Sequence, residues 1–416
     1  MAGPKTINLA TGRLGRFAAL ARAGLGTAAS VALGSSAGIE QAVEKLGELR
    51  GIGTKVGQMA GLVEANLPPE LRARVGPALA KLRAEAARSP YDAIATIVRE
   101  DLGSPPEDLF ATFEQEPFAS ASLGQVHRAT DAAARALAVK VQHPGIDKAF
   151  RGDLENVTSF GRIATSFVMP DGQGKVFIEG VKEGFLAELD YLREAQNLAA
   201  FEALLARDPD LETPSVVAER SSARVLTTTF LRGEPVEAAR SYDAATRRRQ
   251  AAAVRRFVLS SLADHGLLYA DAHAGNFLFR RDGTLGVLDF GSVFRLDEPR
   301  RRAFAELRDA AAAHDRARFD TAVATAYGVA NEVVANAIAN VQWHGLGGLV
   351  WGDAIDAAHV RTITHTVGEM KKKLLGQRFV LPSFMPFMVR TIVATNSLLV
   401  ALDAPASGEL GRIASS

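Results

Sequence analysis

The 416-residue sequence contains no cysteine, which excludes disulfide bridges, thiolate zinc sites and a cysteine nucleophile. Its eight histidines lack the His-Glu-x-x-His spacing of a zinc-peptidase helix. The 48 lysines and arginines nearly equal the 47 aspartates and glutamates, so the net charge does not favour nucleic acid as a partner. The remaining composition is that of an ordinary globular protein, long enough to form more than one lobe.

Long uninterrupted apolar runs are also missing. The two best candidates are residues 17–38, interrupted by Arg22, and residues 384–402, interrupted by Arg390 and Asn396. A central arginine costs about 2.5–3.5 kcal/mol on membrane-insertion scales, so both segments are predicted to be buried amphipathic helices. No signal-peptide cleavage pattern stands out, and the expected location is the cytoplasm.

The first 36 residues carry only basic charge, at Lys5, Arg13, Arg16 and Arg22. Two interpretations stay open. The segment is either a helix in peripheral contact with the inner face of an anionic membrane or a solvated, frayed terminus. The arginines do not fall on one helical face, which favours the second interpretation.

Two carboxylates and an amide in the C-terminal half are spaced as in a phosphoryl-transfer site. Asp271 precedes Asn276 by five residues, and a predicted hairpin separates Asn276 from the Asp-Phe-Gly that begins at Asp289. The protein-kinase signature has a catalytic-loop Asp, a metal-binding Asn and the Asp-Phe-Gly metal ligand in this order. The set predicts Mg²⁺ ligands at Asn276 and Asp289, with Asp271 as catalytic base or water orienter.

This chemistry also needs a lysine on a strand to hold the α and β phosphates of ATP. Lys140, in Ala-Val-Lys-Val, supplies it in the form that kinases use. A lysine among apolar strand residues is costly to bury without a partner, and Glu194 on a following helix is the predicted partner. Taken alone, Lys140 fits an edge-strand lysine with its head in water; the ordered set favours the ion pair.

The glycine-rich loop of protein kinases is absent. The residues predicted to cover the nucleotide are instead Ala119, Ser120, Ala121, Ser122, Leu123, Gly124, Gln125 and Val126. Alanine visits positive φ less readily than glycine, so a stiffer loop that holds the phosphates differently is expected. Thr229 lies at the expected interlobe hinge, where backbone groups would bind adenine.

Apolar periodicity divides the chain into regions of different character. Helices are predicted over residues 39–62, 70–87, 91–101, 176–206, 241–268 and 298–313, and strand character over 123–129, 136–142 and 215–231. Asp282-Gly283 is a two-residue turn signal between the strands of the hairpin. This order predicts an α+β fold with a basic segment (1–36), a helical extension (37–110), a mostly β lobe (111–235) and a mainly helical lobe (236–416).

These motifs resemble the UbiB family of atypical kinase-like proteins, which includes coenzyme Q-associated mitochondrial members. The features that carry the resemblance are Lys55-Val-Gly-Gln58, the Ala-rich loop, Glu188-Leu-Asp190, and Asp271-x-His-x-Gly-Asn with its Asp-Phe-Gly. They span residues 50–300. The resemblance implies a bilobal protein-kinase-like fold with an N-terminal helical extension and a mainly helical C-lobe.

The resemblance also implies a restricted cleft. Lys55 and Gln58 would lie over the position where a protein kinase receives its peptide, with Lys55 in contact with Glu188 and Asp190. Asp190 would add to the metal shell. From the residues alone, Lys55 and Gln58 are polar positions on an apolar helix, and a solvated face is the simpler account.

Some residues depart from the family pattern. Ala272 and Ala274 stand where members commonly have proline, which loosens the loop but removes no ligand. His273 between them fits a hydrogen bond to the loop backbone better than a catalytic acid. After Gly291 the chain runs almost directly into a predicted helix without an Ala-Pro-Glu segment, so docking of a protein substrate is poorly supported.

Three functions remain to be weighed. The leading one is an ATP- and Mg²⁺-dependent ATPase or phosphotransferase that acts on a small molecule or lipid, in isoprenoid quinone or lipid metabolism by resemblance. The second is a catalytically weak nucleotide switch that presents lipids such as quinone precursors. The third is a conventional protein or antibiotic kinase; the absent activation segment and the Ala-rich loop weigh against it.

Overall fold

The computed structural model describes residues 88–121, 123–152, 154, 173–374, 377 and 379–406. The chain divides into two compact units, residues 1–87 with 145–161 and residues 88–144 with 162–416. In the first unit, residues 146–152 are helical. The predicted helices 17–38, 39–62 and 70–87, together with Lys55, Gln58 and Ser122, lie outside the described residues. The predicted site residues that the structure describes all belong to the second unit.

The second unit begins with helix α5 (Tyr91–Leu102) and the short helix α6 (Pro106–Leu109). An antiparallel five-stranded sheet follows, and α5 packs against it. Its strands are β1 (Thr112–Phe113), β2 (Ala119–Ser120), β3 (Gly124–Thr130), β4 (Ala136–Gln142) and β6 (Val225–Thr229). The order is β1-β3-β4-β6, with β2 paired to β3. The predicted strands 123–129 and 136–142 and the helix 91–101 are confirmed.

Alternation along β4 decides which face of the sheet is core and which carries chemistry. Leu137, Val139 and Val141 are fully buried against Ile94 and Val98 of α5. Burying each aliphatic side chain is worth about 1.5–3 kcal/mol. Because successive side chains of a strand point to opposite faces, this core directs Lys140 to the other side of the sheet.

The long helix predicted at 176–206 is interrupted. Helix α8 (Gln173–Leu186) ends in a 3₁₀ turn (Ala187–Leu189), and α9 (Tyr191–Leu205) begins after Asp190. The backbone of Asp190 is extended, at φ −114° and ψ 99°, and its side chain accepts a hydrogen bond from Leu192 N. An Asp in this conformation is a strong N-cap, which apolar periodicity alone does not reveal. The break places Glu194 in the first turn of a new helix.

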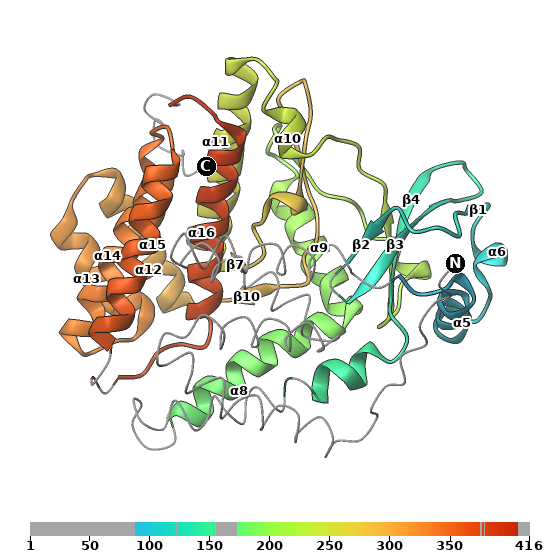
Figure 1. The fold of residues 1–416 in the computed structure, drawn as a ribbon, viewed down its shortest axis with the longest axis horizontal. Helices are drawn as coiled ribbons and strands as arrows, with labels where there is room; N and C mark the ends of the chain where they lie inside the picture. Colours follow the sequence, from blue (N-terminus) through green and yellow to red (C-terminus); the bar gives the residue numbers. More distant parts are fainter. Residues whose placement is uncertain are drawn as a thin grey trace, which may run out of the picture. The chain divides into compact units, whose positions relative to one another are not determined.

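The rest of the unit is mainly helical, as predicted, and Figure 1 shows its last helices side by side in orange and red. The helices are α10 (Val236–Ala239), α11 (Ala244–Ala263), α12 (Glu298–Ala312), α13 (Arg316–Tyr327), α14 (Glu332–Trp351), α15 (Ala357–Leu374) and α16 (Met385–Leu402). Asp243, Asp297, Asp315 and Asn331 cap four of them by accepting hydrogen bonds from free first-turn N–H groups.

Short strands frame the predicted catalytic loop. They are β5 (Leu211–Glu212), β7 (Leu267–Tyr269), β8 (Phe277–Phe279), β9 (Leu285–Val287) and β10 (Val293–Arg295). β8 and β9 form the predicted hairpin, but its turn is one residue longer than Asp282-Gly283. Arg280 N donates to Thr284 O over 3.1 Å, and Gly283 adopts a φ of +90°, which favours glycine.

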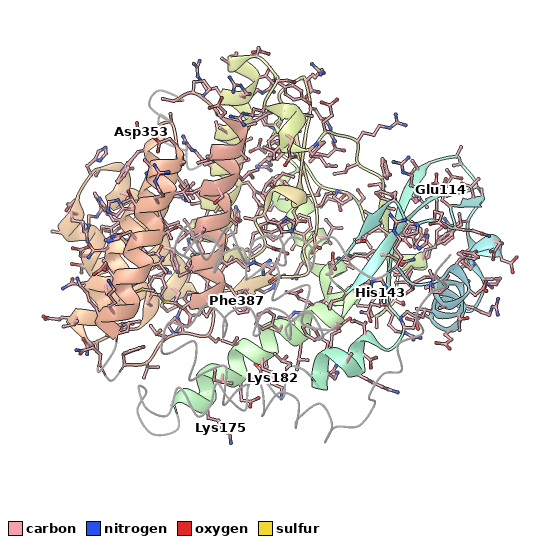
Figure 2. All side chains as sticks on the ribbon, in the orientation of Figure 1. Glu114, His143, Lys175, Lys182, Asp353 and Phe387 are labelled. Atoms are coloured by element: carbon pink, nitrogen blue, oxygen red, sulfur yellow. The ribbon has the colours of Figure 1, made fainter. Side chains whose placement is uncertain are left out.

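Within the described residues, α16 is the helix long and apolar enough to cross a membrane by length and composition. Two thirds of it (67%) is nevertheless buried inside the protein. Phe387, labelled in Figure 2, packs its ring 4.3 Å from that of Phe294 and 5.2 Å from that of Phe185. The prediction of a buried helix at 384–402 is therefore confirmed.

Close packing at Gly124 gives a first testable prediction. A Cβ at this position would lie 2.2 Å from Val141 O and 2.9 Å from the Tyr191 hydroxyl. Gly124→Ala is expected to lower the free energy of unfolding by about 1–3 kcal/mol, because backbone must move to admit the methyl group. Gly368→Ala is the matched control: no atom lies within 4 Å of its Cβ, and helix propensity predicts a gain of up to about 1 kcal/mol. Urea unfolding measures the effect of both substitutions. An equal loss in the free energy of unfolding in the two variants would contradict this account.

Candidate active site

Backbone hydrogen bonds bring the two carboxylates and the amide of the motif to one place. Strand β7 leads into Asp271, and Asn276 Nδ2 donates to Asp271 O over 2.9 Å. Leu288 N donates to Asn276 O over 2.8 Å, and the Tyr269 hydroxyl donates to Leu288 O over 2.6 Å. These contacts hold the catalytic loop against the segment that carries Asp289.

His273 has the structural role that the sequence favoured. Its Nδ1 accepts a hydrogen bond from Gly275 N over 3.0 Å, which caps the 3₁₀ turn Ala274–Asn276. Its Nε2 lies 3.8 Å from Asp271 Oδ1, beyond hydrogen-bonding distance. The histidine therefore shapes the loop that positions Asn276.

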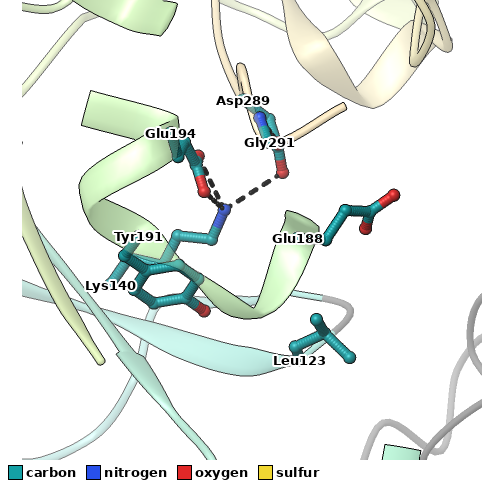
Figure 3. Close-up of a pocket in the computed structure, with 7 residues that line it drawn as sticks. All are labelled: Leu123, Lys140, Glu188, Tyr191, Glu194, Asp289 and Gly291. Atoms are coloured by element: carbon teal, nitrogen blue, oxygen red, sulfur yellow. Dashed lines mark hydrogen bonds and ion pairs between the residues drawn. The ribbon is translucent and has the colours of Figure 1, made fainter. Parts of the chain in front are cut away.

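Lys140 lies between two carboxylates, as Figure 3 shows. Its Nζ donates to Glu194 Oε1 and Oε2 over 2.8 and 2.9 Å and to Asp289 Oδ2 over 3.3 Å. The predicted Lys140–Glu194 pair is therefore present. The Tyr191 ring centroid lies 5.0 Å from the same ammonium, close enough for a cation–π contact. The sheet, α9 and the Asp-Phe-Gly segment each contribute to this contact.

Burial and charge set the protonation states of this cluster. Burial lowers the pKa of Lys140, but the Asp289 and Glu194 carboxylates outweigh it and leave the lysine pKa well above its ordinary value. Burial raises the pKa of Glu194 to about 7, against the attraction of Lys140 and with a further contribution from Asp289. One ammonium does not fully compensate two carboxylates in a poorly solvated site.

This shift predicts a pH dependence of stability. Folded Glu194 gains its proton near pH 7, whereas the ordinary glutamate pKa is 4.5, so the folded state binds more protons between these values. The Glu194 contribution to stability is therefore present at low pH and lost as the pH rises through 7, with a slope of at most about 1.4 kcal/mol per pH unit. Urea unfolding between about pH 5 and 8 measures it. Glu194→Gln should remove the slope, and an unchanged slope in that variant would contradict the assignment.

Asp289 adopts an unusual backbone conformation. Its φ is +55°, in the left-handed region that non-glycine residues seldom occupy. Oδ1 accepts from Gly291 N over 3.1 Å, while Oδ2 faces Lys140. A strained conformation of this kind persists only where surrounding contacts hold it, and such residues cluster at functional sites.

Arg390 is the site residue that sequence reasoning missed. It projects from α16, pairs through Nη2 with Asp271 Oδ1, and is 6% exposed, while Asp271 is 3% exposed. Thr391 beside it donates to Tyr269 O over 3.1 Å, so α16 also contacts the strand before the loop. The available signal was an arginine in the middle of an apolar helix, because such a charge is seldom buried without a partner.

Some residues of the Ala-rich loop belong to the sheet, and one lines the cavity around Lys140. Ala119 and Ser120 form β2, and Ala121 N donates to Gly124 O over 2.9 Å in a tight turn. Leu123 lines the cavity around Lys140, and Val126 lies opposite Lys140 in the strand register. The Gln125 side chain, in contrast, accepts from Ser89 N over 2.8 Å and contacts His127, away from Lys140.

The remaining predicted residues lie in different surroundings. Glu188 is buried and lines the same cavity as Lys140. Asp190 is exposed, caps α9 and lines a second cavity. Thr229 ends β6; its hydroxyl accepts from Ser215 N over 2.8 Å, and its own N–H donates to Ser215 O over 2.9 Å.

The site fits a phosphate-bound Mg²⁺ better than a protein-only metal. In the described part of the chain, no group of three or more His, Cys, Asp or Glu side chains is arranged to hold a metal ion. Because Asn276 Nδ2 is already a donor to Asp271 O, its Oδ1 is the atom available to a cation. One carboxylate and one amide oxygen match Mg²⁺, which usually completes its shell with substrate phosphates and water.

Comparison with known proteins gives these features a family. The model of the ABC1 atypical kinase-like domain matches residues 81–323. The chain is 29% identical over 286 residues to a Danio rerio protein named Atypical kinase COQ8B, mitochondrial, covering 68% of this chain and 45% of that protein. It is 27% identical over 292 residues to Saccharomyces cerevisiae Atypical kinase COQ8, mitochondrial, covering 68% and 57%. The chain thus spans about half the length of these relatives.

A solved structure shows the same fold. The complex of Rv3197 with erythromycin from Mycobacterium tuberculosis superposes with a TM-score of 0.55 at 25% identity, covering 84% of this chain and 88% of that one. The sheet with its ion-paired lysine, the catalytic loop and the helical C-terminal part form an α+β, bilobal kinase-like fold. This chain is therefore a member of the ABC1 family of atypical kinase-like proteins, the UbiB group that its motifs resemble.

Proposed function

We propose that this protein binds Mg-ATP beside Lys140 and uses it as an ATPase or as a phosphotransferase acting on a small molecule or lipid. The observation that carries the proposal is the position of Lys140, hydrogen-bonded to both Glu194 and Asp289. In kinases, the strand lysine, its glutamate and the Asp-Phe-Gly aspartate must all be in place for phosphoryl transfer.

Each residue then has a role set by its position. Lys140 would donate to the α and β phosphates, and Glu194 would orient it. Asp289 and Asn276 would hold Mg²⁺, which neutralises charge that develops on the phosphate oxygens. Asp271, fixed by Arg390, would orient the attacking water or hydroxyl and accept its proton.

The cavity beside Lys140 bears on how the nucleotide enters. It measures about 10 Å³, roughly the space of one water. Leu123 of the Ala-rich loop lines it together with Glu188, Tyr191 and Gly291. Entry of the phosphates would therefore displace this loop. The segment with Lys55 and Gln58, which the resemblance to the UbiB family places over the cleft, would restrict access further.

The test is Mg²⁺-dependent ATP binding and phosphate release by the full chain. We expect binding of a fluorescent ATP analogue that chelation of Mg²⁺ weakens, and phosphate release that depends on Asp271. Asp289→Asn should remove the Mg²⁺ dependence of both, because an amide is a weaker ligand than a carboxylate. Nucleotide affinity that neither chelation nor Asp289→Asn changes would reject the proposed site.

A second candidate is a nucleotide switch with weak turnover that presents a lipid or quinone precursor. The small cavity favours it, because the phosphates of ATP would not fit beside Lys140 without movement of the Ala-rich loop. The relatives named COQ8 make isoprenoid quinone metabolism the pathway to examine first. Mg-ATP binding without phosphate release, together with flotation on anionic vesicles, would favour this candidate and a cytoplasmic protein peripheral to the membrane.

A further inference from the structure

A second and larger cavity lies between α9 and β10. It has a volume of about 530 Å³, which is within the range of small-molecule pockets. Its lining is largely polar and consists of Asp190, Arg193, Gln196, Asn197, Val293, Phe294 and Arg295. Asp190 is expected to contact a metal and Lys55, whereas none of the other described lining residues has a role in the phosphoryl-transfer chemistry proposed above.

Two arginines of this cavity have no side-chain partner among the residues that the structure describes. Arg193 and Arg295 are exposed and make no ion pair or side-chain hydrogen bond in the part of the chain that the structure describes. Elsewhere in the unit, arginines on the surface are commonly paired, as Arg301 is with Glu298 and Arg318 with Glu306. The guanidinium groups of the cavity are thus available to a ligand.

The acid of the cavity does not neutralise these arginines. The Asp190 carboxylate accepts from Leu192 N at the start of α9 and forms no ion pair with either arginine. Gln196 adds a neutral donor to the lining. Planar guanidinium groups bind phosphate oxygens through paired hydrogen bonds, so the chemistry present favours a phosphate group over a neutral ligand.

The cavity is also mechanically connected to the nucleotide site. Arg193 precedes Glu194, the partner of Lys140, by one residue, and Arg295 lies on the strand that follows the Asp-Phe-Gly segment. Asn197 Nδ2 already donates to Phe290 O over 3.0 Å, which joins α9 to that segment. A ligand that bridges the two arginines would strengthen this junction.

We infer that this cavity binds a phosphomonoester, either a soluble metabolite or a lipid headgroup, and that its occupancy raises the affinity of the nucleotide site. The binding part of the inference is independent of the proposed function, whereas the coupling part rests on it. A ligand that orders α9 and β10 together stabilises the arrangement in which Glu194 and Asp289 both reach Lys140.

Calorimetric titration of the full chain with glycerol 3-phosphate and with inorganic phosphate tests the binding. Arg193→Gln combined with Arg295→Gln should weaken binding about tenfold or more, because charge-assisted hydrogen bonds are lost. The matched control combines Arg240→Gln with Arg361→Gln, two exposed arginines that form no ion pair with any described residue, and should bind as the wild type does. Equal affinity of both double variants, or no binding by the wild type, would overturn the inference.

Two further experiments distinguish a lipid headgroup from a soluble metabolite, and the second cavity from the nucleotide site. Binding to vesicles is compared for phosphatidylcholine alone and for phosphatidylcholine with phosphatidic acid. A lipid headgroup is identified as the ligand if only the vesicles with phosphatidic acid bind the wild type and they do not bind the Arg193/Arg295 variant. Lys140→Met should lose nucleotide binding and retain phosphomonoester binding. Loss of both would place the phosphate in the nucleotide site and reject the inference.

The coupling has its own readout. Saturating glycerol 3-phosphate should lower the Kd of the ATP analogue about fivefold or more in the wild type, and leave it unchanged in the Arg193/Arg295 variant. Competition, seen as a weaker nucleotide affinity in both proteins, would reject an effector site.

Discussion

Replacing Arg390 by leucine is expected to lower the free energy of unfolding by about 3–5 kcal/mol and to abolish phosphate release. The guanidinium pairs with Asp271, and both side chains are nearly inaccessible to water. Removing it leaves a carboxylate in a site where water cannot replace the lost partner, and this desolvation dominates the cost. The loss of activity follows because Asp271 would no longer be held in place.

A double-mutant cycle separates the charge from the packing. Asp271→Asn removes the carboxylate, so Arg390→Leu in that background should cost much less stability than in the wild type. Neither combination should restore phosphate release. The surface control is Arg318→Leu, which breaks an exposed pair with Glu306 and should cost less than about 1 kcal/mol. Urea unfolding in which Arg390→Leu costs no more than Arg318→Leu would show that the buried pair is unimportant.

Lys140→Met is expected to have the second large effect. The change leaves Glu194 and Asp289 without their shared cation, and it removes the donor to the α and β phosphates. We expect ATP-analogue affinity to fall about 100-fold or more, as for the loss of a charged, desolvated contact. We also expect a loss of stability toward the 3–5 kcal/mol of a broken buried pair.

The stability loss should depend on pH in a defined direction. Lys140 lowers the pKa of Glu194, which is about 7 in the wild type, so Glu194 of the variant should keep its proton to a higher pH. Below pH 7 Glu194 can be protonated in both proteins, whereas above pH 7 the wild type gains the attraction between the ionised Glu194 and the lysine, and the variant does not. Unfolding experiments on Lys140→Met should therefore show a larger loss at about pH 8 than at about pH 6. Lys372→Met, which breaks an exposed pair with Glu369, is the control and should show little loss at either pH. A loss that does not change with pH would mean that Glu194 is not the group that titrates.

Local patterns predicted much of what positions the site. The alternation in 136–142 determined that Lys140 lies on the face opposite the core, because a strand with an apolar face has only one register that buries it. The spacing of Asp271, Asn276 and Asp289 placed them around one hairpin, because a short hairpin brings its ends together. The break at Asp190 was missed because one polar capping side chain overrides the periodicity of the residues around it.

By itself, the sequence determined the kinase-like order of chemical groups, the strands and helices that carry them, and the pairing of Lys140 with Glu194. Tertiary structure alone decided that Arg390, 119 residues beyond Asp271, pairs with it, and that Gln125 lies toward Ser89 instead of the nucleotide. It also decided that Arg193 and Arg295 share a cavity. The physical reason is that periodicity and spacing report contacts within an element or a hairpin. Which distant side chain compensates a buried charge depends on how helices and strands pack, and no local pattern encodes it.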